Sequence, residues 1–475
     1  MKGRGCFINN TWQETGRWLT IRSPWDGEVV GEVALAGEKE WEAAIQAAQA
    51  AAGDLKKYSS YERRRLLEAL VAGVRERQEE FARTIVAEGG KPITYARAEM
   101  ARGVTTLTLA AEEAARVGGE LVPLDTLPAT KGRMGLTRRF PVGPVLGITP
   151  FNFPFNLMAH KVGPALAAGN PIIVKPASAT PLTTLKLAEI YEAVGGPPGG
   201  FQVLPSPAAL AERAVADERL KALTFTGSSE VGWHLKSVAG RKRVLLELGG
   251  NAALIVDQDA DLKTAAHRAA IGAFAHAGQV CIAVQRILVL APVYDRFKSL
   301  FLEAIDREIT TGDPSREETV VGPLITDAAA ARIRAWVEEA LAGGATMLTG
   351  GPGEGRLIPP TVLENVRREM KVWREEIFGP VATLTPCRDF AQALAMANDS
   401  VYGLQAGVFT NNLAHAWQAF EELEVGGVII NDAPVFRVDH MPYGGVKASG
   451  LGREGVRLAM EELSELRLLA LKISN

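Results

Sequence analysis

Cys281 is the residue of this sequence whose surroundings most suggest covalent chemistry. It ends the stretch AFAHAGQVC, in which Gly278 lets the backbone approach another group closely and Gln279 sets an amide beside the thiol. A thiolate in such a place can attack an electron-poor carbon. The other two cysteines, Cys6 and Cys387, are too few and too scattered to form a disulfide framework or a Cys-rich metal site with it. On this evidence alone a buried structural cysteine is the commoner alternative, because Cys is among the most buried residue types.

Polar residues follow four apolar runs that we predict to be strands. Asn152 comes just after GIT, Lys175 after PIIV, residues 227–232 after LTFT, and Glu247 after VLL. Ligands of open α/β sheets bind where the strands end, so these positions would bring an amide, a cation, a helix start and a carboxylate to one rim. Each also has a simpler interpretation: a helix cap, a solvated loop charge, a plain N-cap and a polar strand end.

The loop at residues 227–232 reads GSSEVG. Backbone N–H groups at a helix start, with the hydroxyl of Ser228, make a pyrophosphate site that needs no basic side chain. The loop matches neither the G-x-G-x-x-G dinucleotide fingerprint nor the G-x-x-x-x-G-K-[ST] phosphate loop. Its spacing alone is therefore a weak indication of a nucleotide site.

The elements that must position these residues follow from the hydrophobic pattern. Residues 6–33 alternate and turn like β-hairpins, residues 38–52 are predicted to form an amphipathic helix, and residues 94–116 show a further helical pattern. A capping box at Ser59 and Glu62 predicts the start of a long helix that ends at residues 89–90. From residue 145 to about 410, short apolar strands alternate with helices, which is typical of a parallel, doubly wound α/β sheet. The final run LRLLALKIS is predicted to be a strand that could add to the sheet of another subunit.

Composition excludes several classes of function. The 475 residues exceed what one core supports, so two or more domains are expected. A net charge of −3 gives no general attraction to nucleic acid or to an anionic membrane. No apolar run suggests a signal peptide or a membrane span, and we expect a cytoplasmic protein. The six histidines lack ligand spacing, so we predict no metal site.

Eight stretches in order resemble the motifs of the NAD(P)-dependent aldehyde dehydrogenase superfamily over essentially the whole chain. They read ITPFNFPFN, IIVKPAS, FTGSSEVG, LELGGN, GQVC, EEIFGP, YGL and PYGGVKASG. The resemblance is closest to the branch of lactaldehyde and other small hydroxyaldehyde dehydrogenases. It implies a Rossmann-type cofactor domain (residues 1–121 and 141–251), an α/β catalytic domain (252–449) and a small β oligomerisation segment (122–140 and 462–475). A homodimer or homotetramer is then expected.

The same resemblance implies a role for each matching position. Cys281 would be the nucleophile, Glu247 the general base, Asn152 an oxyanion donor, and Lys161 a proton relay near the base. Residues that would bind NAD or NADP are Thr149, Pro150, Lys175, Ser178, Gly227, Ser228, Val231, Gly232, Leu248, Glu376 and Phe378. Residues that would face the aldehyde are Phe153, His160, Arg437 and His440. Arg437 and His440 could equally well only brace the glycine-rich loop.

The implied reaction is oxidation of an aldehyde to its acid through a thiohemiacetal and a thioester on Cys281. The presence of Glu247 favours hydrolysis of the thioester over transfer to coenzyme A. Ser178 stands where many NAD-preferring members carry Glu, so we lean to NADP being accepted, with NAD use open. We expect a small hydroxy- or semialdehyde such as lactaldehyde.

Alternatives within and outside the family remain. Succinate-semialdehyde is disfavoured because His160 stands where that branch has arginine, and glyceraldehyde-3-phosphate because Val280 replaces an arginine before the nucleophile. A cysteine esterase or hydrolase would use His276 as the base for Cys281. A non-catalytic member is opposed by the intact set of thiol, carboxylate and amide.

Overall fold

The computed structural model describes residues 3–473, and its first sheet carries the ends of the four predicted strands. The eight strands lie in the order β2-β1-β9-β8-β7-β10-β11-β23, with parallel pairing from β9 through β11. The predicted runs appear as β7 (Val145–Ile148), β8 (Ile172–Lys175), β10 (Ala222–Thr226) and β11 (Arg243–Glu247). Nearly every residue of these strands is buried, which explains their continuous apolar sequence. The remaining strands are β1 (Cys6–Ile8), β2 (Thr11–Gln13), β9 (Phe201–Val203) and β23 (Gly450–Leu451).

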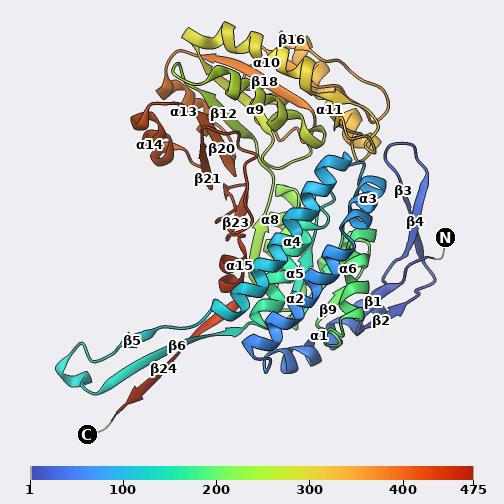
Figure 1. The fold of residues 1–475 in the computed structure, drawn as a ribbon, viewed down its shortest axis with the longest axis vertical. Helices are drawn as coiled ribbons and strands as arrows, with labels where there is room; N and C mark the ends of the chain where they lie inside the picture. Colours follow the sequence, from blue (N-terminus) through green and yellow to red (C-terminus); the bar gives the residue numbers. More distant parts are fainter. Residues whose placement is uncertain (1–2, 474–475) are drawn as a thin grey trace.

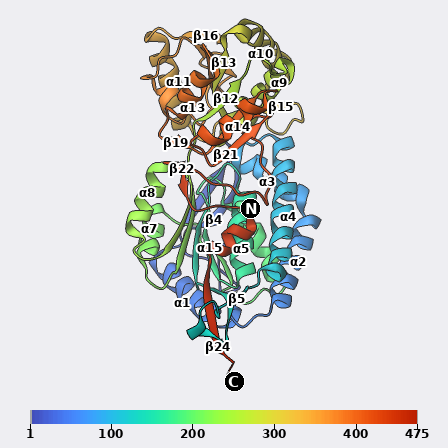
Figure 2. The ribbon, with the colours of Figure 1, turned by 90° about the vertical axis from the view of Figure 1, so that its left-hand side faces the viewer.

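Helices cover both faces of this sheet (Figures 1 and 2). Figure 2 shows α7 and α8 on one side and α2, α4 and α5 on the other. Every residue of α5 is buried, so this helix forms the centre of the packing. The helices are α1 (Glu38–Leu55), α2 (Ser60–Glu76), α3 (Gln78–Gly89), α4 (Ile93–Arg116), α5 (Asn156–Ala168), α6 (Pro181–Ala193), α7 (Ala208–Ala216), α8 (Ser229–Val238) and α15 (Val456–Glu462).

The prediction of one long helix from Ser59 to residues 89–90 is wrong in one respect, because the structure has two helices there. The capping box is present: Ser59 Oγ accepts from the N–H of Glu62, and the Glu62 carboxylate accepts from the N–H of Ser59. Arg77 then leaves the helical region (φ −108°, ψ 14°) and separates α2 from α3. Its guanidinium binds Glu80 and also Glu189 on α6. Because Glu189 is 112 residues away, the local pattern could not reveal this break.

The second sheet has seven strands in the order β16-β17-β18-β13-β12-β20-β21, parallel except for β16. Helices again pack on both faces, with one buried cluster under α9, α10 and α11 and another under α13 and α14. The strands are β12 (Ala252–Val256), β13 (Val284–Leu290), β16 (Thr346–Thr349), β17 (Thr361–Glu364), β18 (Val381–Cys387), β20 (Gln405–Phe409) and β21 (Gly427–Ile430). The helices are α9 (Leu262–Phe274), α10 (Tyr294–Glu308), α11 (Asp327–Ala342), α12 (Lys371–Arg374), α13 (Phe390–Asn398) and α14 (Leu413–Glu422).

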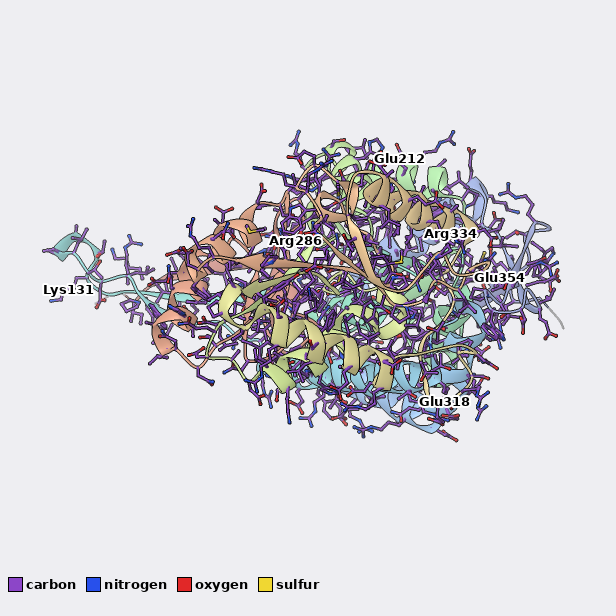
Figure 3. The ribbon with its side chains drawn as sticks, turned by 90° about the horizontal axis from the view of Figure 1, so that it is seen from above. Lys131, Glu212, Arg286, Glu318, Arg334 and Glu354 are labelled. Carbon is purple, nitrogen blue, oxygen red and sulfur yellow. The ribbon has the colours of Figure 1, made fainter. Side chains whose placement is uncertain are left out.

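A three-stranded β-arm projects from the first sheet's side of the molecule (Figure 1). It consists of β24 (Ser464–Lys472), β6 (Arg133–Pro141) and β5 (Leu121–Pro123) in that order. The predicted C-terminal strand is therefore present, and it pairs with β6 of the same chain from Ser464↔Pro141 to Lys472↔Arg133. Lys131 marks the tip of the arm, well away from the body (Figure 3).

Short elements complete the chain. The hairpin of β1 and β2 turns at Asn9 and Asn10, as predicted, and both residues have positive φ. The other short strands are β3 (Trp18–Arg22), β4 (Val29–Ala34), β14 (Thr310–Thr311), β15 (Thr319–Val321), β19 (Tyr402–Gly403) and β22 (Val446–Lys447). The chain forms two mainly parallel sheets and the arm, and the three-part division with its boundaries stays a prediction. None of the helices in residues 3–473 is long and apolar enough to cross a membrane.

Candidate active site

A strained segment delivers Cys281 to the space between the two sheets. After α9 ends at Phe274, His276, Ala277 and Gly278 all have φ between 53° and 65°. Left-handed backbone of this kind is unfavourable for His and Ala, so tertiary contacts must hold it. One such contact is the Gln279 side chain, whose Oε1 accepts from the N–H of Ile325 at 3.0 Å. Gly278 is required because a Cβ there would collide with the backbone oxygen of Gly379.

Cys281, Glu247 and Asn152 line one cavity of about 320 Å³. Residues from both halves of the chain form its walls, and three of the four predicted strand ends contribute to them, while Lys175 lies outside. The lining residues are Phe151, Asn152, Leu157, Thr226, Gly227, Ser228, Glu247, Leu248, Gly249, Cys281, Arg332, Glu376 and Phe378. The structure thus brings together a thiol, a carboxylate and an amide that are far apart in sequence.

The electrostatics of the thiol and the carboxylate are linked. Burial, and then the nearby negative charge of Glu247, raise the pKa of Cys281 well above its usual value. Burial, and then repulsion from Glu454, raise the pKa of Glu247 to about 7. Oε1 of Glu247 has no hydrogen-bond partner within residues 3–473. A carboxyl group with this pKa and a free oxygen can exchange a proton near neutral pH.

Lys161 lies on α5 and is almost completely buried, close enough to Glu247 for the charges of the two groups to interact. Its Nζ donates to Thr226 Oγ1 at 2.7 Å and to Glu454 Oε1 at 3.4 Å. Burial lowers the pKa of Lys161, and Glu454 opposes that shift. The pKa of Glu454 falls to about 2 despite burial, because Lys161 and Arg437 both stabilise its charge. Glu454 was missed by the sequence reasoning, although it directly follows the glycine-dense stretch SGLGR.

A buried ion pair fixes the segment that carries Asn152. Lys91 Nζ lies 2.5 Å from Glu99 Oε2, and both side chains are almost completely inaccessible. Oε1 of Glu99 accepts from the backbone N–H of Phe155 (2.8 Å) and of Asn156 (3.1 Å). Lys91 Nζ also lies 3.5 Å from the ring centroid of Phe153. This pair was not predicted; its only sequence signal is a lysine in the Gly-Gly-Lys-Pro turn after α3.

The predicted cofactor residues divide into two groups. Gly227, Ser228, Leu248, Glu376 and Phe378 line the cavity, and burial raises the pKa of Glu376 to about 7. The other predicted residues lie outside its walls, mostly along the neighbouring strand ends, where the N–H of Thr149 donates to the backbone oxygen of Lys175 at 3.2 Å. This outer group is Thr149, Pro150, Lys175, Ser178, Val231 and Gly232.

These residues fit a dinucleotide. The N-terminus of α8, a helix of 10 residues, offers backbone N–H groups and the Ser228 hydroxyl to a pyrophosphate. Glu376 Oε1 accepts from the N–H of Gly250 at 2.9 Å, and its carboxyl faces Gly249, where a Cβ would collide with it. The buried carboxyl is thereby held at the cavity wall, where ribose hydroxyls could donate to it.

The four predicted substrate residues have different surroundings. His160 Nε2 lies 3.0 Å from Asp439 Oδ1, and Arg437 Nη2 lies 2.9 Å from Glu454 Oε2, so both already have carboxylate partners. His440 is exposed. Phe153 packs between Lys91 and His276, and the centroids of the Phe153 and His276 rings lie 6.3 Å apart.

His276 is not paired with Cys281 as a hydrolase would require. It is fully buried, and neither ring nitrogen has a hydrogen-bond partner among the residues described. Burial lowers its pKa well below the usual value, with Lys91 adding to the shift. Its neighbour is the ring of Phe153.

Comparison with known proteins identifies the family. The sequence profile described as the aldehyde dehydrogenase family matches residues 12–469. This chain belongs to that family. A 3-sulfolactaldehyde dehydrogenase of Priestia aryabhattai is 43% identical over 474 residues, which span 100% of this chain and 99% of that protein. A lactaldehyde dehydrogenase of Methanococcus aeolicus is 36% identical, over 98% of this chain and 99% of that protein.

Crystal structures of aldehyde dehydrogenases agree with the fold. Aldehyde dehydrogenase 21 of Physcomitrella patens, solved with its product succinate, superimposes with a TM-score of 0.96 at 44% identity, covering 99% of this chain and 98% of that one. The NADP-dependent glyceraldehyde-3-phosphate dehydrogenase of Bacillus halodurans, solved with NADP, gives 0.97 at 34% identity and covers all of both chains. The predicted family and fold class are confirmed, and this aldehyde dehydrogenase is an NAD(P)-dependent oxidoreductase.

Proposed function

We propose that this aldehyde dehydrogenase oxidises a small hydroxy- or semialdehyde to its carboxylic acid by covalent catalysis at Cys281. The observation that carries the proposal is the shared cavity of Cys281, Glu247 and Asn152 beside the start of α8. A nucleophile, a base and an amide donor are the groups that acyl chemistry requires. Their convergence from β11, the α9–β13 connection and the β7–α5 loop supports one reaction centre.

The first step is attack of the Cys281 thiolate on the aldehyde carbon. The thiol proton passes to Glu247, whose pKa of about 7 suits it to accept and later release a proton. The new Sγ–C bond moves the carbonyl electron pair onto oxygen. Asn152 uses one N–H to bind the backbone oxygen of Gln279 at 2.9 Å, which leaves the second N–H for this oxyanion. The backbone N–H of Cys281 can supply another donor.

A bound nicotinamide would supply the hydride acceptor, so that the adduct on Cys281 could be oxidised to the level of an acid. Glu247 then acts on the resulting thioester of Cys281. It removes a proton from water, the water oxygen bonds to the acyl carbon, and the C–S bond breaks to return the thiolate. Lys161, 2.7 Å from Thr226 and 3.4 Å from Glu454, can relay the proton away from Glu247.

We propose that the enzyme uses NAD or NADP, and that its cofactor site can accept the 2′-phosphate of NADP. Ser178 is exposed and carries no charge that would repel a 2′-phosphate. Lys175 is largely buried at the end of β8, and no carboxylate among residues 3–473 contributes to the shift of its pKa. Burial lowers the pKa of Lys175, and an anionic group on the cofactor would oppose that shift.

The substrate class rests on the relatives. The matched proteins are named for 3-sulfolactaldehyde and lactaldehyde, and one solved structure holds succinate, so all concern short aldehydes with a polar group. The deciding experiment is a panel of lactaldehyde, 3-sulfolactaldehyde, succinate semialdehyde, glyceraldehyde-3-phosphate and unsubstituted propanal, each assayed with NAD and NADP. A higher kcat/KM for a substituted short aldehyde than for propanal supports the proposal. Equal rates with propanal would contradict it.

The enzyme is also proposed to be a homodimer or homotetramer assembled through the β-arm. Four leucines of β24 are between 37% and 55% exposed in the single chain, which is unusual for a strand of this composition. The free edge of β24 also offers unpaired backbone groups to another strand. These leucines are Leu466, Leu468, Leu469 and Leu471.

A further inference from the structure

The hydroxyl of Tyr443 faces the sulfur of Cys281. The distance from the phenolic oxygen to Sγ is 3.2 Å, and Tyr443 is only 2% exposed. Within the described chain the hydroxyl has no other hydrogen-bond partner. Because a buried tyrosine hydroxyl needs a partner, this contact is what satisfies it.

The ring of Tyr443 is held from two sides. The Arg437 guanidinium carbon lies 3.6 Å from the ring centroid, in a cation–π arrangement. Arg437 in turn binds Glu454 at 2.9 Å, and Glu454 binds Lys161. The backbone of Tyr443 also exchanges two hydrogen bonds with that of Glu454, of 3.0 Å and 2.6 Å. The phenol therefore has little freedom to turn away from the sulfur.

The protonation state of Tyr443 suits it to donate. Burial, and then the negative charges of Cys281 and Glu247, raise the pKa of Tyr443 well above its usual value, so the hydroxyl stays protonated. The charged groups that act on the Cys281 thiol are Glu247, which raises its pKa, and Arg437, which lowers it. Donation by Tyr443 also lowers the pKa of the thiol and so favours the thiolate.

We propose that Tyr443 is a further catalytic residue, whose hydroxyl donates to Cys281 Sγ and stabilises and orients the thiolate. Arg437 is a positioning residue that acts through the ring of Tyr443, rather than a reader of the substrate. This inference rests on the proposed role of Cys281 as the nucleophile. The buried ion pairs that link Lys161, Glu454 and Arg437 would then hold Tyr443 in place as well as relay protons.

The test follows the thiol directly, without aldehyde or cofactor. The rate of Cys281 alkylation by iodoacetamide is measured against pH for the full-length enzyme and for Tyr443→Phe, and labelling of Cys281 is confirmed by peptide mass. Loss of a hydrogen bond to the charged form is expected to raise the apparent pKa of the thiol by about one unit or more. Alkylation near neutral pH then slows about tenfold. An unchanged profile would overturn the proposal.

Two other variants make the result specific. Tyr191→Phe is the matched control, since it removes another buried hydroxyl, one that donates to the backbone oxygen of Pro197 at 2.8 Å, and it is expected to leave the alkylation profile unchanged. If Tyr443→Phe does not fold, Arg437→Lys provides the test: it keeps a charge for Glu454 but loses the flat face over the ring. A shift in the same direction supports the proposal, and no shift overturns it.

The inference and the proposed function can fail separately. A shifted alkylation profile in Tyr443→Phe supports the role of Tyr443 whether or not the enzyme oxidises any aldehyde of the panel. If the wild-type enzyme oxidises none of them, only the proposed function is contradicted. Conversely, active oxidation with an unshifted profile would leave the function standing and remove Tyr443 from it. In the active case, kcat is expected to fall in Tyr443→Phe while KM for the cofactor stays the same.

Discussion

The side-chain amide of Asn152 donates to the backbone oxygen of Gln279 at 2.9 Å. This bond ties the predicted oxyanion donor, on the loop after β7, to the strained segment that carries Cys281. The amide orientation follows, because its nitrogen must face Gln279 and its second N–H is left for a ligand. This bond therefore fixes the relative position of two parts of the site that come from different sheets.

Replacing Asn152 with Ala is expected to lower kcat by about 10²–10³, the usual cost of losing one oxyanion donor. The measurement is steady-state formation of reduced cofactor with the best aldehyde of the panel. Asn170→Ala is the matched control, because Asn170 binds Gly143 and Leu463 away from the cavity. It is expected to lower stability but to leave kcat within about twofold. A full kcat in Asn152→Ala would remove this residue from the oxyanion site.

Glu247→Gln is expected to allow a burst of reduced cofactor followed by slow turnover, since a neutral amide cannot deprotonate the water that cleaves the thioester. Rapid mixing resolves the burst from the steady state. A steady-state rate equal to that of the wild type would contradict the assignment of Glu247 as the base.

The pH dependence of the wild-type enzyme tests the same residue. Burial and Glu454 raise the pKa of Glu247 to about 7, so the carboxyl is protonated and inactive as a base below that pH. The rate of thioester hydrolysis is expected to rise with pH through about 7 and then level off. In Glu247→Gln this rise is expected to vanish, and a retained inflection would assign it to another group.

Ser178→Glu is expected to shift the ratio of kcat/KM for NADP over NAD toward NAD. The new carboxylate would repel the 2′-phosphate of NADP and could accept hydrogen bonds from the ribose hydroxyls of NAD. Kinetics with both cofactors at several concentrations give the ratio. An unchanged ratio would refute the argument from Ser178.

Glu99→Ala is expected to lower the free energy of unfolding by about 3–5 kcal/mol, because it leaves the Lys91 ammonium buried without its partner. It also removes the acceptor of two backbone N–H groups, so kcat is expected to fall as the Asn152 segment loosens. Urea unfolding gives the first quantity. Glu68→Ala is the control, since its ion pair with Arg64 is exposed to solvent and contributes little to stability.

Leu468→Glu is expected to weaken self-association, since it places a charge on the exposed face of β24. Sedimentation velocity of the wild type and the variant measures the change. A wild-type enzyme that sediments as a monomer would contradict the proposed dimer or tetramer.

Much of the first sheet could be predicted because buried parallel strands are short continuous apolar runs. PVLGIT, PIIVK, ALTFT and RVLLE are such runs; Lys175 and Glu247 end β8 and β11, and Asn152 lies in the loop after β7. Several residues of the cavity walls were expected from that topology together with the family resemblance, whereas Leu157 and Arg332 were not.

The contacts that were missed join residues with no shared local pattern. Tyr443 reaches Cys281 across 162 residues, and Phe155 reaches Glu99 across 56. No periodicity marks such polar pairs, since their partners are fixed only when helices and loops have packed. His160 and Arg437 illustrate the same point, because both were predicted to face the aldehyde and each binds a carboxylate in the fold.

Because β23, near the end of the chain, pairs with β11 in the first sheet, the order of synthesis limits when the active site can form. Glu247 pairs with Gly450, and Leu246 with Leu451, so the strand that carries the base remains a sheet edge until some 200 further residues have been made. At about 5–20 residues per second that interval lasts on the order of ten seconds or more on the ribosome. A nascent chain can thus assemble most of the first sheet early, but its base is secured only after the thiol-bearing half has emerged.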